Sequence, residues 1–228
     1  ELANAQRRSF RLRDALRALR EAPSRPYTYV LIDCPPSLNL LTVNAMTAAD
    51  AVFVPLQTEF FALEGLTQLM RTVDLVRGSL NPQLEIQGVV LTMFDRRNSL
   101  SEQVARDVRA AYDQAAAVTP QVRGVIPVGE SWLRAISTGF ADGNPYDGIA
   151  FGQVSLWTHD YHHASNYGYY LEALMIFGHV TNRDPRSLGG DEAAAFELGM
   201  SKEQAETLQR IAAEELAAAQ AIVDAYAA

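Results

Sequence analysis

Hydrophobic residues along this chain fall into two patterns: short continuous runs and longer stretches with helical spacing. A short run that is apolar on both faces is typical of a central strand in a parallel sheet. Such runs predict strands at 28–33, 51–55, 88–93 and 122–128. Apolar residues three and four positions apart predict helices at 7–22, 40–48, 61–78 and 99–117. The alternation predicts an α/β fold with a doubly wound parallel sheet.

The pattern changes after Gly129. Residues 139–160 are rich in Gly, Asn, Asp, Pro and aromatic side chains, which predicts a loop. The helices predicted beyond it are 165–181, 191–198 and 202–226. Ser201 and Gln204 have the spacing of a capping box at the start of the last one. The sequence therefore predicts a helical C-terminal extension.

Composition narrows the class of protein. The 228 residues carry a net charge of −8, and the sequence pI is near 5.0, which argues against a strongly basic nucleic-acid binder. No apolar run approaches the roughly 18 residues of a membrane span, and no secretory signal is seen. The single cysteine, Cys34, excludes an internal disulfide and fits a reducing compartment. We expect a cytoplasmic protein that does not bind membranes.

The first predicted helix is unusually rich in arginine. Its basic residues are Arg7, Arg8, Arg11, Arg13, Arg17 and Arg20. One interpretation is a solvated helix face, which is what most charged stretches are. The other interpretation is a patch that faces phosphate groups.

Asp33 directly follows the predicted strand 28–33 and precedes Pro35 and Pro36. In a parallel sheet, ligands bind at the carboxyl ends of the strands. A carboxylate there can hold Mg²⁺, which prefers one or two carboxylates together with phosphates. Alternatively, the carboxylate caps the next helix or accepts hydrogen bonds from nearby amides. The residues alone leave both interpretations open.

Longer motifs around Asp33 favour the first interpretation. The stretches "YVLIDCPP", "PLQTEFFALEGL" and "VVLTMFDRRNSLSEQV" resemble the ParA/Soj family of partitioning ATPases, which are deviant Walker-type P-loop proteins. The resemblance runs from Glu1 to about Arg109. It implies an incomplete P-loop NTPase-like fold, with ATP and Mg²⁺ as cofactors and a homodimer and DNA as partners. It also implies that Asp33 is the Walker B residue, which binds the cofactor and the metal, and that the stretch through Asn44 belongs to the dimer switch.

One part of the family pattern is missing from the chain. A phosphate cradle needs glycine N–H groups and a lysine that reaches the phosphates. The only lysine is Lys202, and no glycine-rich loop precedes it. The family's P-loop would lie before Glu1, and we expect the natural start to lie there too. We expect this chain by itself not to bind ATP and to be inactive as an ATPase.

The second half carries a different motif. In "HDYHHASNYGYYLEALMIFG", Asp160 and His163 are three residues apart just before a predicted helix. Such a pair can supply the orienting group and the general base of a serine hydrolase. This block resembles the C-terminal part of SGNH/GDSL-type hydrolases over about residues 110–212. The resemblance implies that Asp160 and His163 are catalytic, with a small ester as substrate.

The nucleophile of that family is missing, because its Gly-Asp-Ser block does not occur in the chain. Two other interpretations of the motif stay open. His159, His162 and His163 could bind a metal together with Asp160, or the histidines could be structural residues at a loop–helix junction.

The two resemblances predict two domains. Residues 1–115 would be a truncated ParA-like P-loop NTPase segment, and residues 116–228 an SGNH-like segment with a helical tail. Three functions follow for the joined chain. It is a ParA-like ATPase fragment without its P-loop, an ester hydrolase remnant without its nucleophile, or a non-catalytic interaction domain.

Overall fold

The computed structural model describes most of the chain. The described residues are 7–21, 27–35, 37, 39–57, 62–92, 99–118, 124–144, 146–161 and 163–227. Within these ranges every helix is too short or too polar to cross a bilayer.

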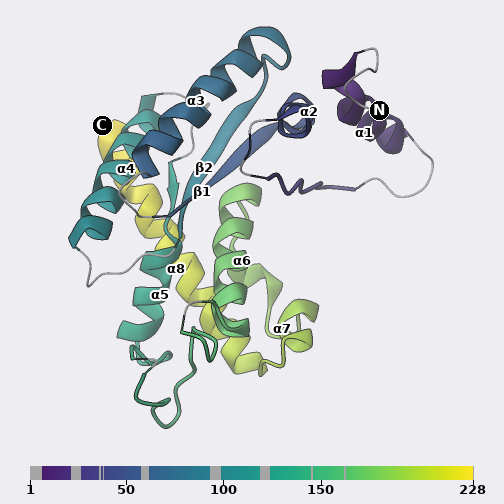
Figure 1. The fold of residues 1–228 in the computed structure, drawn as a ribbon. Helices are drawn as coiled ribbons and strands as arrows, with labels where there is room; N and C mark the ends of the chain where they lie inside the picture. The colour runs from purple at the N-terminus through teal and green to yellow at the C-terminus, as the bar shows by residue number, and fades with distance from the viewer. Residues whose placement is uncertain are drawn as a thin grey trace. The chain divides into compact units, whose positions relative to one another are not determined.

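Strands and helices alternate in the first half of the chain, and helices dominate the second half (Figure 1). The strands are β1 (Ala51–Gln57), β2 (Glu85–Thr92) and β3 (Val125–Ile126). The helices are α1 (Arg11–Glu21), α2 (Leu40–Ala48), α3 (Ala62–Ser79), α4 (Ser99–Val118), α5 (Val128–Ser137), α6 (Asn166–Thr181), α7 (Ala193–Glu197) and α8 (Lys202–Ala227). Short 3-10 turns at Arg8–Phe10 and Pro185–Leu188 precede α1 and α7.

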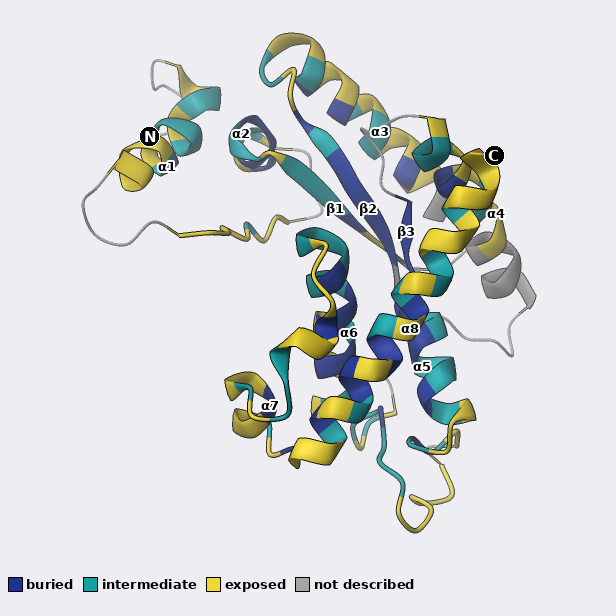
Figure 2. Ribbon diagram, turned by 180° about the vertical axis from the view of Figure 1, so that it is seen from behind, coloured by how far each residue is buried: buried dark blue, intermediate teal, exposed yellow. Residues whose placement is uncertain are grey.

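The sheet has the order β1-β2-β3. Strands β2 and β3 pair in parallel, with Val89 opposite Val125 and Val90 opposite Ile126 (Figure 2). The predicted α/β class, the parallel pairing and the helical C-terminal region are therefore confirmed.

One predicted strand is wrong. Residues 27–35 have no strand in the structure, and the side chains of Tyr29, Val30 and Leu31 are 57%, 51% and 84% exposed. A strand requires the backbone of a neighbouring strand to satisfy its N–H and C=O groups. The described sheet consists of β1, β2 and β3, and residues 27–35 are not paired with any of them. Asp33 therefore does not stand at the carboxyl end of a strand here.

The chain forms two compact units, and the division passes through β1 and β2. The first unit is Glu1–Phe53 with Leu63–Gln87, and the second is Val54–Ala62 with Gly88–Ala228. These units differ from the predicted domains 1–115 and 116–228. Compactness says nothing about family origin, so that boundary stays a prediction.

In the first unit, asparagine side chains cap both ends of α2. The Asn39 Oδ1 accepts hydrogen bonds from the backbone N–H groups of Leu41, at 2.9 Å, and Thr42, at 3.2 Å. At the other end, Asn81 Nδ2 donates to the carbonyl oxygens of Met46 and Ala49, at 3.0 and 2.8 Å. These bonds satisfy backbone groups that a helix leaves unpaired at its ends.

In the second unit, α8 is the central element. It packs against α4, α5 and α6, and α5 and α6 also contact each other (Figure 1). The face of α8 that meets these helices is buried, while its other face is exposed (Figure 2). Leu171 of α6 and Leu208 and Ile211 of α8 are fully buried. The capping box at the start of α8 is confirmed, because Ser201 N donates to Gln204 Oε1 at 2.9 Å and Gln204 N donates to Ser201 Oγ at 3.2 Å.

Helix α5 was not predicted from the sequence. Pro127 and Gly129 lie at its start, and both residues argue against a helix interior. The helix nevertheless buries Val128, Ser131 and Ala135 on one face. Burial of this face against α6 and α8 outweighs the weak local propensity.

Gly168, buried in α6, offers a test of this packing. A Cβ at this position would lie 2.5 Å from the Leu156 carbonyl oxygen and 2.7 Å from Trp132 Cζ2. We expect Gly168→Ala to lower the free energy of unfolding by about 1–3 kcal/mol, because backbone and an indole ring must shift to admit the methyl group. Urea unfolding followed by circular dichroism measures this loss.

The matched control is Gly65→Ala in α3. A Cβ at Gly65 meets nothing within 4 Å. This variant should gain about 0.5–1 kcal/mol from the lower conformational entropy of the unfolded chain. Equal effects of the two substitutions would contradict the packing described around Gly168.

Candidate functional site

Asp33 lies in the exposed segment 27–35. Its side chain is exposed, and the neighbouring Cys34 is exposed and not disulfide-bonded. Partial burial, and secondarily the negative charge of Asp33, raise the pKa of the Cys34 thiol. The Cys34 Sγ donates to the Ile32 carbonyl oxygen at 3.7 Å. This arrangement leaves the Asp33 carboxylate in solvent.

The described residues do not fit a Mg²⁺–ATP site. Lys202, the only lysine in the sequence, lies in α8 and forms an ion pair with Asp191. The hydrogen bond and the charge of Asp191 raise the pKa of Lys202. Among the described residues, no group of three or more His, Cys, Asp or Glu side chains could hold a metal ion. The role of Asp33 in binding cofactor and metal therefore stays a prediction.

Asp160 and His163 do lie together. The His163 Nδ1 is 2.5 Å from the Asp160 Oδ2, so the hydrogen bond expected between them is present. The other carboxylate oxygen, Oδ1, accepts from the His163 N–H at 3.0 Å and from the Thr158 hydroxyl at 2.5 Å. A carboxylate that accepts from Nδ1–H leaves Nε2 of a neutral imidazole as the acceptor. The pair can therefore hold a proton and present a basic nitrogen.

The loop around this pair is tightly hydrogen-bonded. Thr158 N donates to the His163 carbonyl oxygen at 2.8 Å, and Tyr161 N donates to the Thr158 carbonyl oxygen at 3.1 Å. Tyr161 has a φ of 61°, in the left-handed region that an aromatic residue rarely adopts. Closure of the loop between Thr158 and His163 requires this unfavourable backbone conformation at Tyr161.

The Asp160–His163 pair lies at the surface. The side chain of His163 is 71% exposed and that of Asp160 is 39% exposed. Both nearby serines have local structural bonds. Ser165 Oγ donates to the Ser155 carbonyl oxygen at 2.6 Å and accepts from Gly168 N at 3.3 Å, while Ser155 Oγ donates to the Trp157 carbonyl oxygen at 2.9 Å. Neither serine is placed as a partner of the imidazole.

The metal interpretation of the histidines gains no support from the described part of the chain. His159 is exposed, and His162 lies outside the described residues. No metal-binding group forms among the residues that surround Asp160 and His163 in the described ranges. The catalytic role of Asp160 and His163 stays a prediction.

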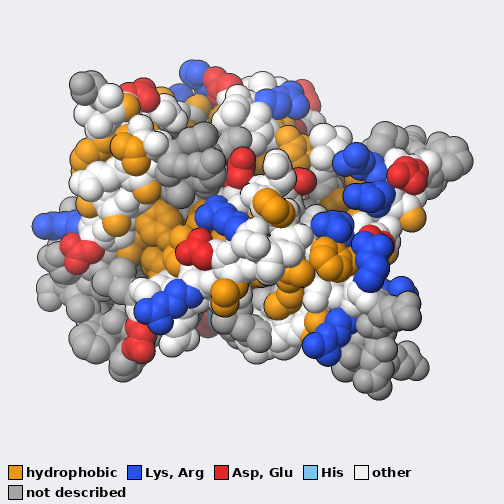
Figure 3. Space-filling model, turned by 90° about the horizontal axis from the view of Figure 1, so that it is seen from above, with side chains coloured by type: hydrophobic (Ala, Val, Ile, Leu, Met, Phe, Trp, Pro, Cys, Tyr) orange, Lys and Arg blue, Asp and Glu red, His pale blue; other side chains and the backbone are white. Residues whose placement is uncertain are grey.

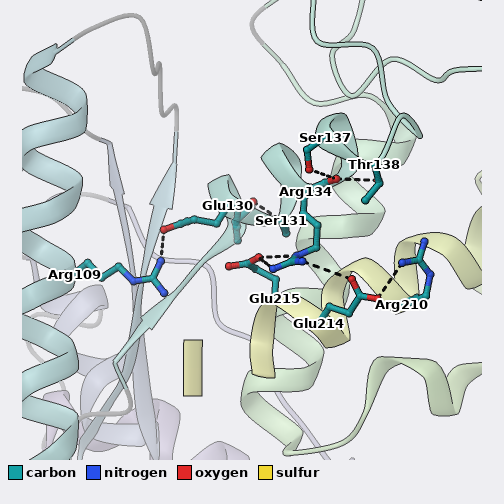
Figure 4. Close-up of polar contacts among 10 residues, drawn as sticks. Arg109, Glu130, Ser131, Arg134, Ser137, Thr138, Arg210, Glu214 and Glu215 are labelled. Carbon is teal, nitrogen blue, oxygen red and sulfur yellow. Dashed lines mark hydrogen bonds and ion pairs between the residues drawn. The ribbon is translucent and has the colours of Figure 1, made fainter. Parts of the chain in front are cut away.

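Sequence reasoning missed a charge cluster at the junction of α4, β3 and α5. Arg109 Nε lies 3.3 Å from the Asp113 Oδ2. Arg109 also forms an ion pair with Glu130 (Figure 4). The Asp113 Oδ1 accepts from the Val125 N–H at 3.4 Å. Asp113 is only 3% exposed, so this carboxylate fixes the start of β3 from inside the protein.

A second cluster joins α5 to α8. The Arg134 Nε and Nη2 both lie 2.8 Å from the Glu215 Oε2, and Nη1 lies 3.6 Å from Glu214 (Figure 4). Arg210 also donates to Glu214, at 3.0 Å. Arg134 and Glu215 are 81 residues apart in sequence, and no local pattern indicates such a pair. Both clusters connect helices, and their groups are paired with one another, which is typical of structural ion pairs.

Asp113 generates a prediction about pH. Burial raises the pKa of the Asp113 carboxyl above 3.8, although the charge of Arg109 opposes the shift. The folded chain then holds this proton more tightly than the unfolded chain, so stability falls as pH rises from 3.8 through the raised pKa. The free energy of unfolding of the wild type, relative to Asp113→Asn, should decline over this window and level off above it.

Urea unfolding of both proteins at a series of pH values measures this difference. Asp74→Asn is the matched control, because Asp74 is 69% exposed and pairs with Arg77 on the surface of α3. A relative stability of the wild type that rises with pH would show that Arg109, rather than burial, dominates at Asp113.

Comparisons with known proteins match the first half of the chain. A family model described as "AAA domain" matches residues 1–86. The chromosome partitioning protein ParA of Caulobacter vibrioides is 80% identical over 112 residues, which is 49% of this chain and 41% of the relative. The sporulation initiation inhibitor protein Soj of Bacillus subtilis is 51% identical over 109 residues, covering 48% of this chain and 42% of the relative.

A solved structure is also similar. Cobyrinic acid a,c-diamide synthase from Mycobacterium smegmatis, with bound ADP and magnesium, shares 32% identity over 60% of this chain and 58% of that chain, with a TM-score of 0.44. The matches to ParA and Soj each span about two fifths of the length of the relative. The N-terminal half of the chain is therefore similar to ParA/Soj-type P-loop ATPases.

Proposed function

We propose that residues 1–109 are a segment of a ParA-like chromosome- or plasmid-partitioning ATPase, and that these 228 residues do not turn over ATP by themselves. The observation that carries this proposal is the 80% identity to the ParA protein of Caulobacter vibrioides over 112 residues. Identity at that level extends through surface positions as well as the core. It favours a shared role for the segment, with a homodimer and DNA as the partners of the complete protein.

Asp33 is the proposed magnesium ligand of that complete protein. Its segment, 28–33, has the apolar pattern of a buried strand but is exposed in this structure. The physical requirement for ordering it is a neighbouring strand on which its backbone can form hydrogen bonds. In this proposal Asp33 becomes a useful ligand only when such a strand and a phosphate cradle are both present.

A second candidate function is specific to the second unit. The 2.5 Å contact between Asp160 and His163 is the geometry that a hydrolase uses to orient its general base. We propose it as an ester hydrolase remnant without its nucleophile, to be weighed against a structural pair that closes the loop before α6. A third candidate, a non-catalytic interaction domain, requires neither a nucleophile nor a phosphate cradle.

Nucleotide binding tests the first proposal. We expect the chain to show no ATP turnover and at best millimolar affinity for Mg²⁺–ATP, because most phosphate contacts come from a cradle of backbone N–H groups that this sequence does not contain. Titration of a fluorescent ATP analogue in the presence of Mg²⁺ measures the affinity. Micromolar binding of the ATP analogue that Asp33→Ala weakens would contradict the proposal that this chain is inactive.

A hybrid protein tests whether the segment supports ATP hydrolysis when the rest of a relative is present. Residues 1–109 replace the matching stretch of the Caulobacter vibrioides relative, and the hybrid is assayed for ATP hydrolysis. We expect the hybrid to hydrolyse ATP, the hybrid with Asp33→Ala to lose this activity, and the hybrid with Asp74→Ala to keep it. A folded hybrid without activity would contradict a ParA-like role for the segment.

Esterase activity tests the second candidate. An imidazole without an aligned nucleophile can at most activate water, so we expect no hydrolysis of p-nitrophenyl acetate above background. The wild type is compared with His163→Ala and, as a control for free imidazole, His159→Ala. Activity that only His163→Ala abolishes would show that a nucleophile is present in the chain.

A further inference from the structure

The loop between α5 and α6 contains two copies of one dipeptide. Asp142–Gly143 and Asp147–Gly148 are the two Asp-Gly sequences of the chain, and no Asn-Gly sequence occurs in it. The stretch 135–182 that holds them has neither lysine nor arginine. Basic side chains instead gather over α1, in the other unit (Figure 3). Neither aspartate therefore has a basic side chain in its own segment to stabilise its ionised form.

The first dipeptide, Asp142–Gly143, is held in place. The Asp142 Oδ1 accepts from the Asn144 N–H at 2.8 Å, and Oδ2 accepts from the Ala150 N–H at 2.7 Å. These hydrogen bonds lower the pKa of the Asp142 carboxyl. Gly143 is packed as well, since a Cβ at this position would lie 3.0 Å from Ile136 Cγ2. The carboxylate of Asp142 is therefore fixed in position and favoured in its ionised form.

The second dipeptide, Asp147–Gly148, lies in the open. Both residues are exposed, and Asp147 forms no hydrogen bond or ion pair with any residue that the structure describes. A Cβ at Gly148 would meet nothing within 4 Å. Gly148 has a φ of 97°, which glycine adopts without strain. No contact with a described residue therefore prevents the Asp147 carboxyl from turning toward the Gly148 nitrogen.

We propose that Asp147 is a site of spontaneous isoaspartate formation. The Gly148 backbone nitrogen attacks Cγ of the protonated Asp147 carboxyl, and the new N–Cγ bond closes a succinimide ring. The proton of the nitrogen and the hydroxyl group of the carboxyl leave together as one molecule of water. Glycine admits this attack because it has no Cβ to crowd the nitrogen. The hydrogen bonds at Asp142 oppose the same reaction there, because they favour the ionised carboxylate, which has no hydroxyl group to lose.

Hydrolysis of the ring completes the reaction. Water adds to either ring carbonyl carbon, and the bond from that carbon to the Gly148 nitrogen breaks. Cleavage at Cγ restores aspartate, whereas cleavage at the main-chain carbonyl carbon of Asp147 leaves the chain running through Cγ, which is isoaspartate. One water leaves and one returns, so the mass is unchanged and water is the only other reactant. The proposal does not depend on the functions proposed for either half of the chain.

The product alters a loop that hydrogen bonds close. The contact between Asp142 Oδ2 and Ala150 N spans Asp147, and isoaspartate adds one methylene group to the main chain inside it. The preceding residue, Tyr146, has its ring centroid 4.9 Å from that of Tyr161. Because Tyr161 belongs to the loop that carries the second candidate site, the modification changes the surroundings of that site.

Proteolysis of the aged protein tests the proposal. The full chain is kept folded at physiological temperature and mildly acidic pH. Samples taken over weeks are digested with the endoprotease Asp-N, which cuts before aspartate but not before isoaspartate. We expect uncut sites to accumulate about tenfold faster at Asp147 than at Asp142, because hydrogen bonds hold Asp142 in its ionised form. Mass spectrometry should detect the uncut peptide 142–159 at unchanged mass, with a minor form that is lighter by one water.

Two controls separate the effect of structure from that of sequence. Asp147→Glu keeps the charge but requires a larger ring, so the water-loss form at this position should disappear. In urea, where neither dipeptide is protected, both should react at similar rates. Equal rates in the folded protein would overturn the proposal, as would complete cleavage at Asp147 throughout the incubation. A preference for Asp147 in urea as large as that in the folded protein would also overturn it, because the local sequence would then explain the difference.

Discussion

Burial of one face of α8 is the interaction on which the second unit depends. Leu208 and Ile211 of α8 are fully buried against helices that come from three separate parts of the chain. Hydrophobic burial has no direction of its own. The register between α5 and α8 is fixed instead by Arg134 and Glu215, whose two contacts of 2.8 Å are directional. Removal of Arg134 would leave the Glu215 carboxylate, which is only 7% exposed, without this partner, and that costs more than the pair contributes.

Sequence patterns predicted accurately those features that are formed by residues close together in the sequence. The helix predicted at 40–48 is observed as Leu40–Ala48, and the one at 165–181 as Asn166–Thr181. The capping box of Ser201 and Gln204 was predicted because both partners lie within one turn. By contrast, β3 is limited to Val125–Ile126 in the described residues, since Pro127 cannot donate to a ladder and the helix begins at the next residue.

The same distinction separates the candidate sites. The contact between Asp160 and His163 lies within one loop, so a spacing of three residues was enough to predict it. The environment of Asp33 depends on strands that are distant in sequence, and the apolar pattern of 28–33 could not report whether they are present. No periodic pattern in the sequence predicts the ion pairs of Arg109 with Glu130 and of Arg134 with Glu215, because their partners come together only after the helices pack.

The exposed segment 27–33 has a consequence for handling the protein. Residues 28–32 are a β-branched threonine followed by Tyr29, Val30, Leu31 and Ile32, a window without charge, proline or glycine. Unpaired backbone with such side chains in solvent is a template for strand pairing between molecules. We expect any self-association through this window to rise with protein concentration, and a single charged residue in place of Leu31, the most exposed of these side chains at 84%, to oppose it.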